Sequence, residues 1–154
     1  MLANFHALPE ESRIWLYAAE NALSKGQQDY ILKVISDALK GWNAHKQPLT
    51  AGVTILENHF IVVALDENKN GASGCSIDTL QNTIQKIEKE LTLSLMNRLN
   101  VFCKIEDEVL CIPSFKLRNV ADKDTLFYDL TILTKSDLNT YLKQISEGWC
   151  AHLV

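Results

Sequence analysis

The run Phe60-Ile61-Val62-Val63-Ala64-Leu65 limits more than any other feature what this chain can fold into. Every position is apolar, so a strand built from this run would present apolar side chains on both of its faces. Such a strand is typical of the middle of a sheet that is covered on both sides. The run is also far short of the roughly 20 apolar residues that span a bilayer. We therefore predict a central strand over residues 60–66.

Further segments place this strand in a sheet. Val53 to Glu57 is also rich in β-branched residues, and the link Asn58-His59 predicts a tight hairpin because Asn tolerates the positive φ that such turns need. Upstream, Arg13 to Tyr17 alternates with period two, which predicts another strand. A capping-box spacing at Ser24 precedes helical periodicity and predicts a helix over residues 26–41.

A second helix and a second hairpin are predicted downstream of the central strand. Apolar residues at spacings of three and four begin at Ile77 and predict an amphipathic helix that ends at about residue 96. Apolar and polar residues then alternate over residues 99–105 and again over 109–111, on either side of the acidic turn Glu106-Asp107-Glu108. This pattern is typical of two antiparallel strands.

The C-terminal part completes the predicted order of elements. The polar segment Lys116 to Asp124 predicts a loop, Thr125 to Leu133 a strand, and the residues from Ser136 onward a short third helix. The order β-α-β-β-α-β-β-β-α begins like a ferredoxin-like split βαβ unit. At 154 residues the chain has an ordinary size for one domain. We expect a single α+β domain whose antiparallel or mixed sheet is covered by about three helices.

Two parts of the chain are similar to each other. Leu32-Lys33-Val34-Ile35-Ser36 precedes Gly41-Trp42-Asn43-Ala44-His45, and Leu142-Lys143-Gln144-Ile145-Ser146 precedes Gly148-Trp149-Cys150-Ala151-His152. A duplicated strand-helix unit would explain this similarity. True repeats usually need several stacked copies to form a core, so the sequence leaves a duplication open.

Charge and cysteine usage exclude several classes of function. The formal net charge of -4 and a pI near 5.5 give no broad positive field, so we expect no binding to nucleic acid. No basic signal region and no run of membrane-spanning length is present, so we expect a cytoplasmic protein without membrane insertion. The four cysteines form no Cys-x-x-Cys pair, which predicts free thiols, no metal and no cofactor.

The segment from Gly71 to Asp78 carries the most distinctive chemistry. Its glycines allow a ligand to approach the backbone, and the side chains of Ser76 and Asp78 can satisfy free amides at the start of the following helix. The helix dipole there favours anions and would lower the pKa of the Cys75 thiol. The predicted ligand contacts are Gly71, Ser73, Gly74, Ser76 and Asp78. The alternative is a strand-to-helix connection with a buried, inert cysteine.

Other side chains could assist such a site. A thiol nucleophile needs a base, and we predict His45 for this role because it lies near the end of the first helix; a solvent-facing histidine is the alternative. Arg13, Trp15 and Tyr17 share one face of a strand, so they could line a ligand groove with Arg13 as a contact. A packed helix or a partner protein would explain the same aromatic face.

Two of the remaining cysteines lie at equal distances from Asp107. A three-residue hairpin loop would therefore place Cys103 and Cys111 directly opposite each other. They would then be two small core residues or, alternatively, a redox pair.

Four segments together resemble a family of small bacterial proteins that carry the label "ABC transporter ATPase". They are Arg13 to Tyr17, Trp42 to His45, Leu65-Asp66-Glu67 and Gly71-Ala72-Ser73-Gly74-Cys75-Ser76-Ile77-Asp78. The resemblance covers most of the chain but implies no particular activity, cofactor or catalytic residue.

The label itself can be tested on the sequence. ATP hydrolysis by that class needs a Gly-x-x-x-x-Gly-Lys-Ser/Thr loop, and this chain contains no Gly-Lys pair. Leu23 to Gln28 is similar to the Leu-Ser-Gly-Gly-Gln signature and Ile61 to Glu67 to a strand ending in Asp-Glu, but a capped helix and a buried strand explain both. We therefore expect either binding of a small anionic ligand at residues 71–78 or a non-catalytic domain that binds a protein partner.

Overall fold

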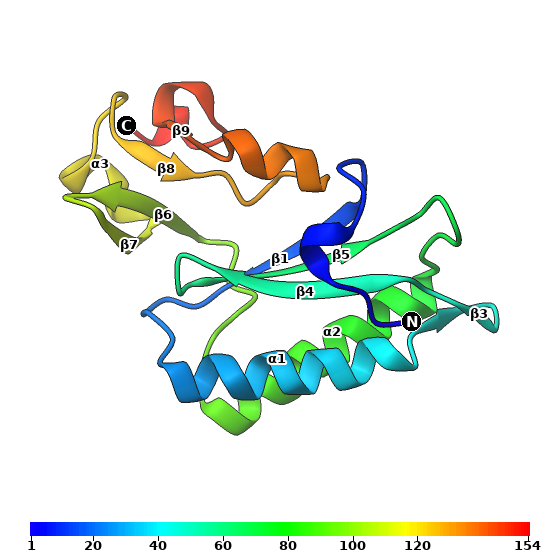
Figure 1. Ribbon diagram of the computed structural model, residues 1–154. Coiled ribbons are helices and arrows are strands. Elements are labelled where there is room, and N and C mark those ends of the chain that lie inside the picture. Colours follow the sequence, from blue (N-terminus) through cyan, green and yellow to red (C-terminus); the bar gives the residue numbers. More distant parts are fainter.

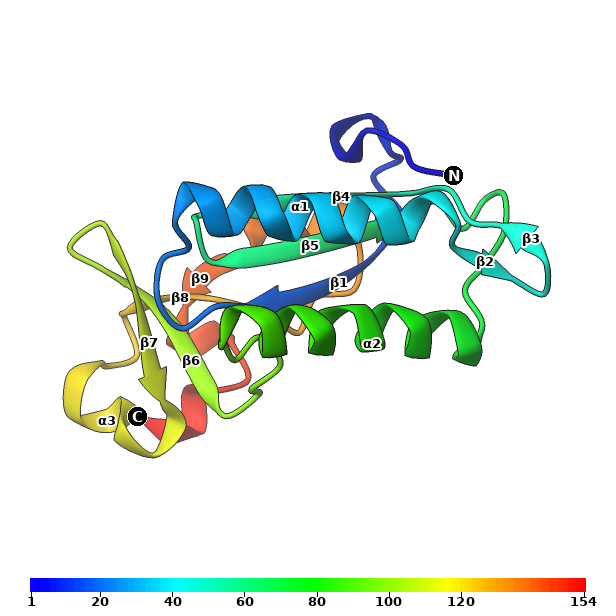
Figure 2. The same ribbon diagram turned by 90° about the horizontal axis from the view of Figure 1, so that it is seen from below.

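The computed structural model describes residues 1–154 and has an α+β architecture (Figure 1). Strands β1 (Arg13–Ala18), β4 (Ala51–Leu56) and β5 (Phe60–Leu65) form an antiparallel sheet in the order β1-β5-β4. Helices α1 (Lys25–Lys40) and α2 (Gly74–Leu91) lie side by side on one face of this sheet (Figure 2). No helix is long and apolar enough to cross a membrane.

The central-strand prediction is confirmed by the burial of β5. All of its residues have an exposed fraction of 0%. Ile61, Val63 and Leu65 pack in the core under the two helices, whereas Phe60, Val62 and Ala64 pack in a second core on the opposite face. Side chains alternate between the faces of a strand, so an unbroken apolar run needs a cover on both sides.

The second cover is another sheet. Strands β6 (Asn100–Ile105), β7 (Glu108–Pro113), β8 (Leu126–Tyr128) and β9 (Leu142–Gln144) are antiparallel in the order β7-β6-β8-β9. The 3-10 helices η1 (Phe5–Ala7) and η3 (Lys135–Thr140) lie over the same face of the first sheet, as Figure 1 shows.

The predicted split βαβ start is present, but its continuation differs. Strand β5 lies between β1 and β4 and is antiparallel to both. In a ferredoxin-like sheet the strand after the second helix would pair with the free edge of β1. Here β6 joins the second sheet instead. The edge of β1 is touched only at its ends, where Ile14 N–H donates to Leu133 O and Ala18 N–H donates to Leu95 O, both at 3.0 Å.

Several predicted boundaries need correction. The helix expected to reach residue 96 ends at Leu91, because Thr92 takes a left-handed φ of 54°. The following segment is held by the Glu88 carboxylate, which accepts from Leu95 N–H at 2.8 Å. In the first hairpin Asn58 has the predicted positive φ, but the other residue of the turn is Glu57 and not His59.

The C-terminal predictions were the least accurate. The strand predicted over 125–133 is only β8, and the predicted loop contains the 3-10 turn η2 (Ser114–Lys116) and the short helix α3 (Leu117–Val120). The third helix predicted from Ser136 is absent. Its residues form η3, strand β9 and two 3-10 turns, η4 (Ile145–Glu147) and η5 (Ala151–Leu153). Although these residues have helical spacing, Leu142–Gln144 pairs with β8 as a strand and does not form a helix.

Candidate functional site

The predicted corner at residues 71–78 is a capped helix start. Ser73 is the N-cap of α2, and its Oγ accepts from Ser76 N–H at 3.1 Å while Ser76 Oγ accepts from Ser73 N–H at 2.8 Å. This reciprocal capping box satisfies two backbone donors. The amides of Gly74 and Cys75 make no hydrogen bond within the chain.

A small hairpin lies beside this corner. Strands β2 (Asn43–Ala44) and β3 (Gln47–Pro48) are joined by His45 and Lys46, both with positive φ. The buried indole of Trp42 donates through Nε1 to the carbonyl of Ser76 at 2.8 Å. This hydrogen bond fixes the base of the hairpin against the first turn of α2.

Between hairpin and helix lies an open groove of about 380 Å³. It brings together four of the predicted site residues, His45, Ser73, Cys75 and Ser76, and it adds Lys46. None of its ten lining residues is acidic. The thiol and its predicted base therefore face one groove, although they are about 30 positions apart in the sequence.

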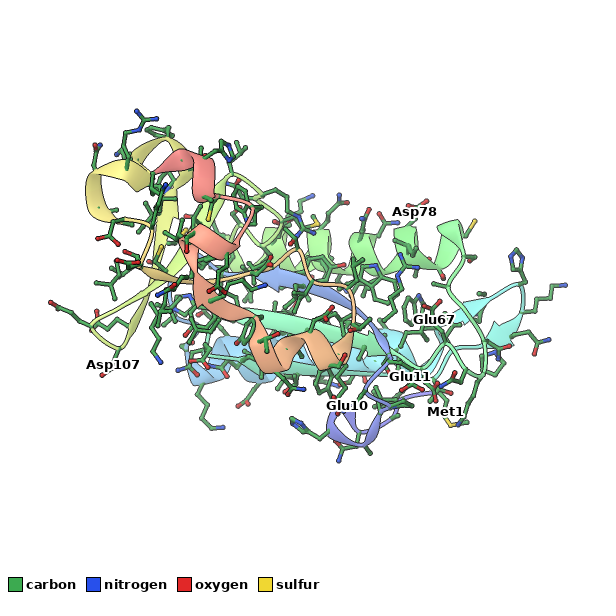
Figure 3. The ribbon with its side chains drawn as sticks, turned by 90° about the horizontal axis from the view of Figure 1, so that it is seen from above. Met1, Glu10, Glu11, Glu67, Asp78 and Asp107 are labelled. Carbon is green, nitrogen blue, oxygen red and sulfur yellow. The ribbon has the colours of Figure 1, made fainter.

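The other predicted contacts lie elsewhere. Gly71 and Asp78 do not line the groove, and Asp78 projects from the outer face of α2 without capping it (Figure 3). Gly74 contributes an open amide but is not part of the groove wall. Arg13 stacks its guanidinium over the ring of Trp15, 4.7 Å from the ring centre.

The aromatic face of β1 is explained by helix packing. Tyr17 is buried in the core under α1 and α2, and Trp15 packs against the same core. Trp15 also meets Trp42 edge to face, with ring centres 5.8 Å apart. The aromatic residues of this face are therefore explained by core packing, and Arg13 lines neither the groove at residues 71–78 nor any larger pocket.

The four cysteines occupy different environments. Cys75 is exposed, and the alternative of a buried thiol at this corner does not apply. Burial raises the pKa of Cys103 to about 12 and that of Cys111 to about 11, and it also raises the pKa of Cys150. These three thiols are protonated at neutral pH. No group of three or more His, Cys, Asp or Glu side chains is placed to hold a metal ion.

The predicted pairing of Cys103 with Cys111 is wrong. The hairpin turn contains two residues, Glu106 and Asp107, so Cys103 pairs with Leu110 and Cys111 lies opposite Phe102 instead. Asp107 stands at the tip of this hairpin in Figure 3. A register change of one residue moves a side chain to the other face of the strand, which places the two thiols in different cores.

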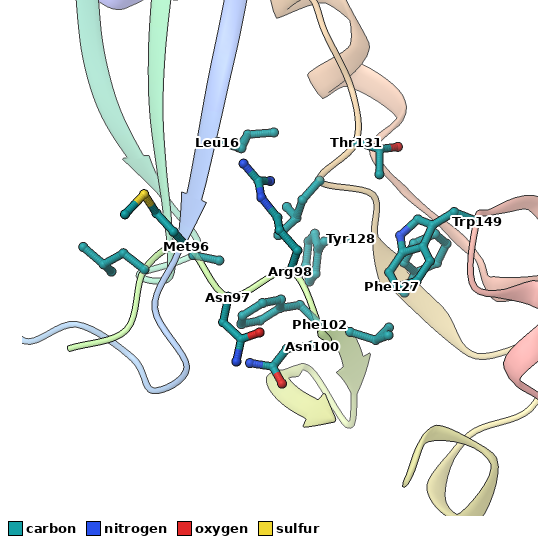
Figure 4. A pocket seen from close by; sticks show the side chains of 14 residues that line it. Leu16, Met96, Asn97, Arg98, Asn100, Phe102, Phe127, Tyr128, Thr131 and Trp149 are labelled. Atoms are coloured by element: carbon teal, nitrogen blue, oxygen red, sulfur yellow. The ribbon is translucent and has the colours of Figure 1, made fainter. Parts of the chain in front are cut away.

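Another cavity, which no sequence pattern indicated, lies between the two sheets (Figure 4). It has a volume of about 180 Å³ and lies along the open edge of β1, between the contacts made by Ile14 and Ala18. Its walls are mostly apolar and include four aromatic rings. These rings belong to Phe102, Phe127, Tyr128 and Trp149.

Arg98 is the one charged residue that lines this inter-sheet pocket. It is exposed and takes part in none of the five ion pairs of the protein. Neighbouring Asn97 and Asn100 add amide groups, and Asn100 donates to the carboxylate of Glu20 at 3.3 Å. The guanidinium itself has no carboxylate partner.

Sequence patterns could not have revealed this pocket. Its wall combines β1, the connection after α2, strands β6 and β8, and Trp149 near the C-terminus. The segment Met96-Asn97-Arg98 falls between a predicted helix and a predicted strand, so periodicity gives it no role.

The comparisons with known proteins add no family. No family model, curated protein or solved structure matches this chain. The resemblance to small bacterial proteins, the anion site at residues 71–78 and the alternative of an interaction domain all stay predictions.

Proposed function

We propose that this protein binds a small, mostly apolar molecule in the inter-sheet pocket. The observation that carries the proposal is the cavity of about 180 Å³ with aromatic walls at the unpaired edge of β1. Ligand sites are typically apolar clefts with a few placed polar groups, which is the character of this wall.

The size of the cavity supports a ligand role. Protein interiors are packed densely and seldom leave voids larger than a water molecule. An engineered apolar cavity of about 150 Å³ binds benzene. The present pocket has a similar volume, and its exposed wall residues Arg98 and Trp149 leave it open to solvent, so a small molecule can enter it.

The chemistry of the wall favours binding over catalysis. The pocket contains no cysteine, histidine or carboxylate, the groups that most often act as nucleophile or general base. Tyr128 contributes a hydroxyl group whose pKa is raised by burial, so it stays protonated at neutral pH, whereas the Thr131 hydroxyl donates to the Asp129 carboxylate. The pocket can therefore hold and orient a molecule without transforming it.

The proposal can be tested with a neutral aromatic probe and a variant that fills the cavity. We expect phenylacetamide at millimolar concentration to shift the amide NMR signals of Ala18, Phe102 and Tyr128, with few shifts elsewhere. Ala18→Leu should abolish these shifts because its side chain occupies the cavity. The matched control Ala7→Leu adds the same atoms at an exposed site and should leave binding unchanged. Absence of shifts at the pocket in the unmodified protein would rule the proposal out.

A further inference from the structure

We infer that the ligand of the inter-sheet pocket is a small monocarboxylic acid, whose carboxylate is held by the Arg98 guanidinium and the Leu16 backbone amide. This inference rests on the proposed function and names the chemical class of the ligand. It combines a cation without a partner, a strand edge without a partner and an apolar chamber of limited size.

The first element is the charge of Arg98. Guanidinium groups bind carboxylates through paired hydrogen bonds, and within the chain Arg98 has neither an ion pair nor a hydrogen-bond acceptor. Figure 4 shows the side chain of Arg98 extending from the connection before β6 toward Leu16 on β1. The cation thus faces the pocket at the strand edge.

The second element is the peptide group of Leu16. Residues along an antiparallel strand alternate in the direction of their hydrogen bonds. Ile14 and Ala18 direct their N–H groups away from β5, to Leu133 O and Leu95 O, so Leu16 between them directs its N–H to the same side. No backbone group outside the β1–β5 ladder bonds to Leu16. A donor therefore lies open on the pocket side of a residue that is otherwise buried.

These two donors favour a carboxylate over a phosphate. One guanidinium and one amide can satisfy the two oxygens of a singly charged carboxylate. A phosphate monoester carries nearly two negative charges at neutral pH, whereas Arg98 is the only cation in the wall. No helix N-terminus or glycine-rich loop, the usual backbone donors to phosphate, lines the pocket.

The chamber limits the body of the acid. A volume of about 180 Å³ accommodates one aromatic ring with a short link to the carboxylate. The rings of Phe102, Phe127, Tyr128 and Trp149 can contact such a body by stacking or edge contacts. Arylacetic acids and alkanoic acids of similar length are the chemical class that fits.

The test compares phenylacetate with phenylacetamide, which has the same shape without the charge. We expect the unmodified protein to bind phenylacetate at least about tenfold more tightly in a calorimetric or NMR titration, because hydrogen bonds to a charged group are the stronger kind. Arg98→Gln should weaken phenylacetate binding about 10- to 100-fold and phenylacetamide binding much less, because only the acid loses a charge-assisted hydrogen bond. The matched control Arg118→Gln removes the same charge from α3, outside the pocket, and should change neither.

A direct readout comes from the Leu16 amide. Its proton signal should move downfield with phenylacetate and move less with phenylacetamide, as a bond to a carboxylate requires. Equal affinity for both probes, or unchanged phenylacetate affinity in Arg98→Gln, would overturn the inference that the ligand is a carboxylic acid. If phenylacetamide still bound in the pocket, the proposed function would stand. Failure of both probes to bind would remove the proposed function and the inference together.

Discussion

Two Gly-Trp-x-Ala-His segments with nearly the same sequence occupy opposite environments in this protein. Trp42 is 4% exposed and donates to Ser76 O, whereas Trp149 is 40% exposed and lines the inter-sheet pocket. Gly41 ends a helix and has open space where a side chain would begin, but a Cβ on Gly148 would lie 2.1 Å from the ring of Phe127. The two segments therefore have similar sequences but pack in different ways.

The residues that precede the two segments differ just as much. Leu32 to Ser36 lies within α1, whereas Leu142 to Ser146 forms strand β9 and the turn η4. The structure therefore contains no duplicated strand-helix unit. Helix α1 is stabilised by its own cap and apolar stripe, whereas β9 is stabilised by pairing with β8.

The largest expected difference between the segments is at their glycines. Gly148→Ala should lower the free energy of unfolding by about 3 kcal/mol, since overpacking a rigid aromatic neighbour forces the core to shift. Gly41→Ala should change it by less than about 0.5 kcal/mol. Urea titrations followed by circular dichroism measure both. Equal effects at the two glycines would show that the segments are packed alike after all.

A smaller difference is expected at the tryptophans. Trp42→Phe removes the donor to Ser76 O and should destabilise the protein by about 1–2 kcal/mol, because a buried hydrogen bond and part of the core packing are lost. Trp149→Phe removes no side-chain hydrogen bond, so its free energy of unfolding should lie within about 0.5 kcal/mol of that of the unmodified protein. The same unfolding titration applies, and a larger loss at Trp149 would reverse the comparison.

The thiols near the two segments should react at different rates. Cys75 beside the first segment is exposed, whereas Cys150 within the second is buried with a raised pKa. A thiol reagent such as dithionitrobenzoate at pH 7 should therefore modify Cys75 quickly, the half-buried Cys111 slowly, and Cys103 and Cys150 only on unfolding. Cys75→Ser should remove the fast phase. A fast phase that persists in this variant would assign the accessible thiol to another cysteine.

The smallest effect expected is spectroscopic. Trp149 borders the inter-sheet pocket, and Trp42 lies on the far side of the first sheet under the helices. Binding of phenylacetamide should change the tryptophan fluorescence by some per cent, and Trp149→Phe should remove this change. A signal that is lost in Trp42→Phe and kept in Trp149→Phe would place the probe in the other groove.

Much of the first half of the fold could be predicted from the sequence. The apolar run at residues 60–65 and the capping pair Ser24 and Gln27 act through neighbours in the chain, and both predictions are confirmed. The C-terminal errors have a common cause. Leu142 to Gln144 has helical spacing in the sequence, but its partner strand lies some 15 residues earlier and gives a competing pattern that no local window contains.

The two candidate sites also differ in how much of each could be predicted from the sequence. The sequence marked Cys75 and His45, and the hydrogen bond from Trp42 to Ser76 is what brings them to one groove. It gave no sign of the inter-sheet pocket, because Leu16, Arg98 and Trp149 have no pattern in common.

By itself the sequence determined the central strand, the capped helices and the split βαβ order, since these depend on side-chain periodicity and on hydrogen bonds between near neighbours. Only the tertiary structure decided that the strand after α2 leaves the edge of β1 unpaired. That choice depends on packing between residues far apart in the chain. It creates the cavity in which Arg98 and the Leu16 amide meet.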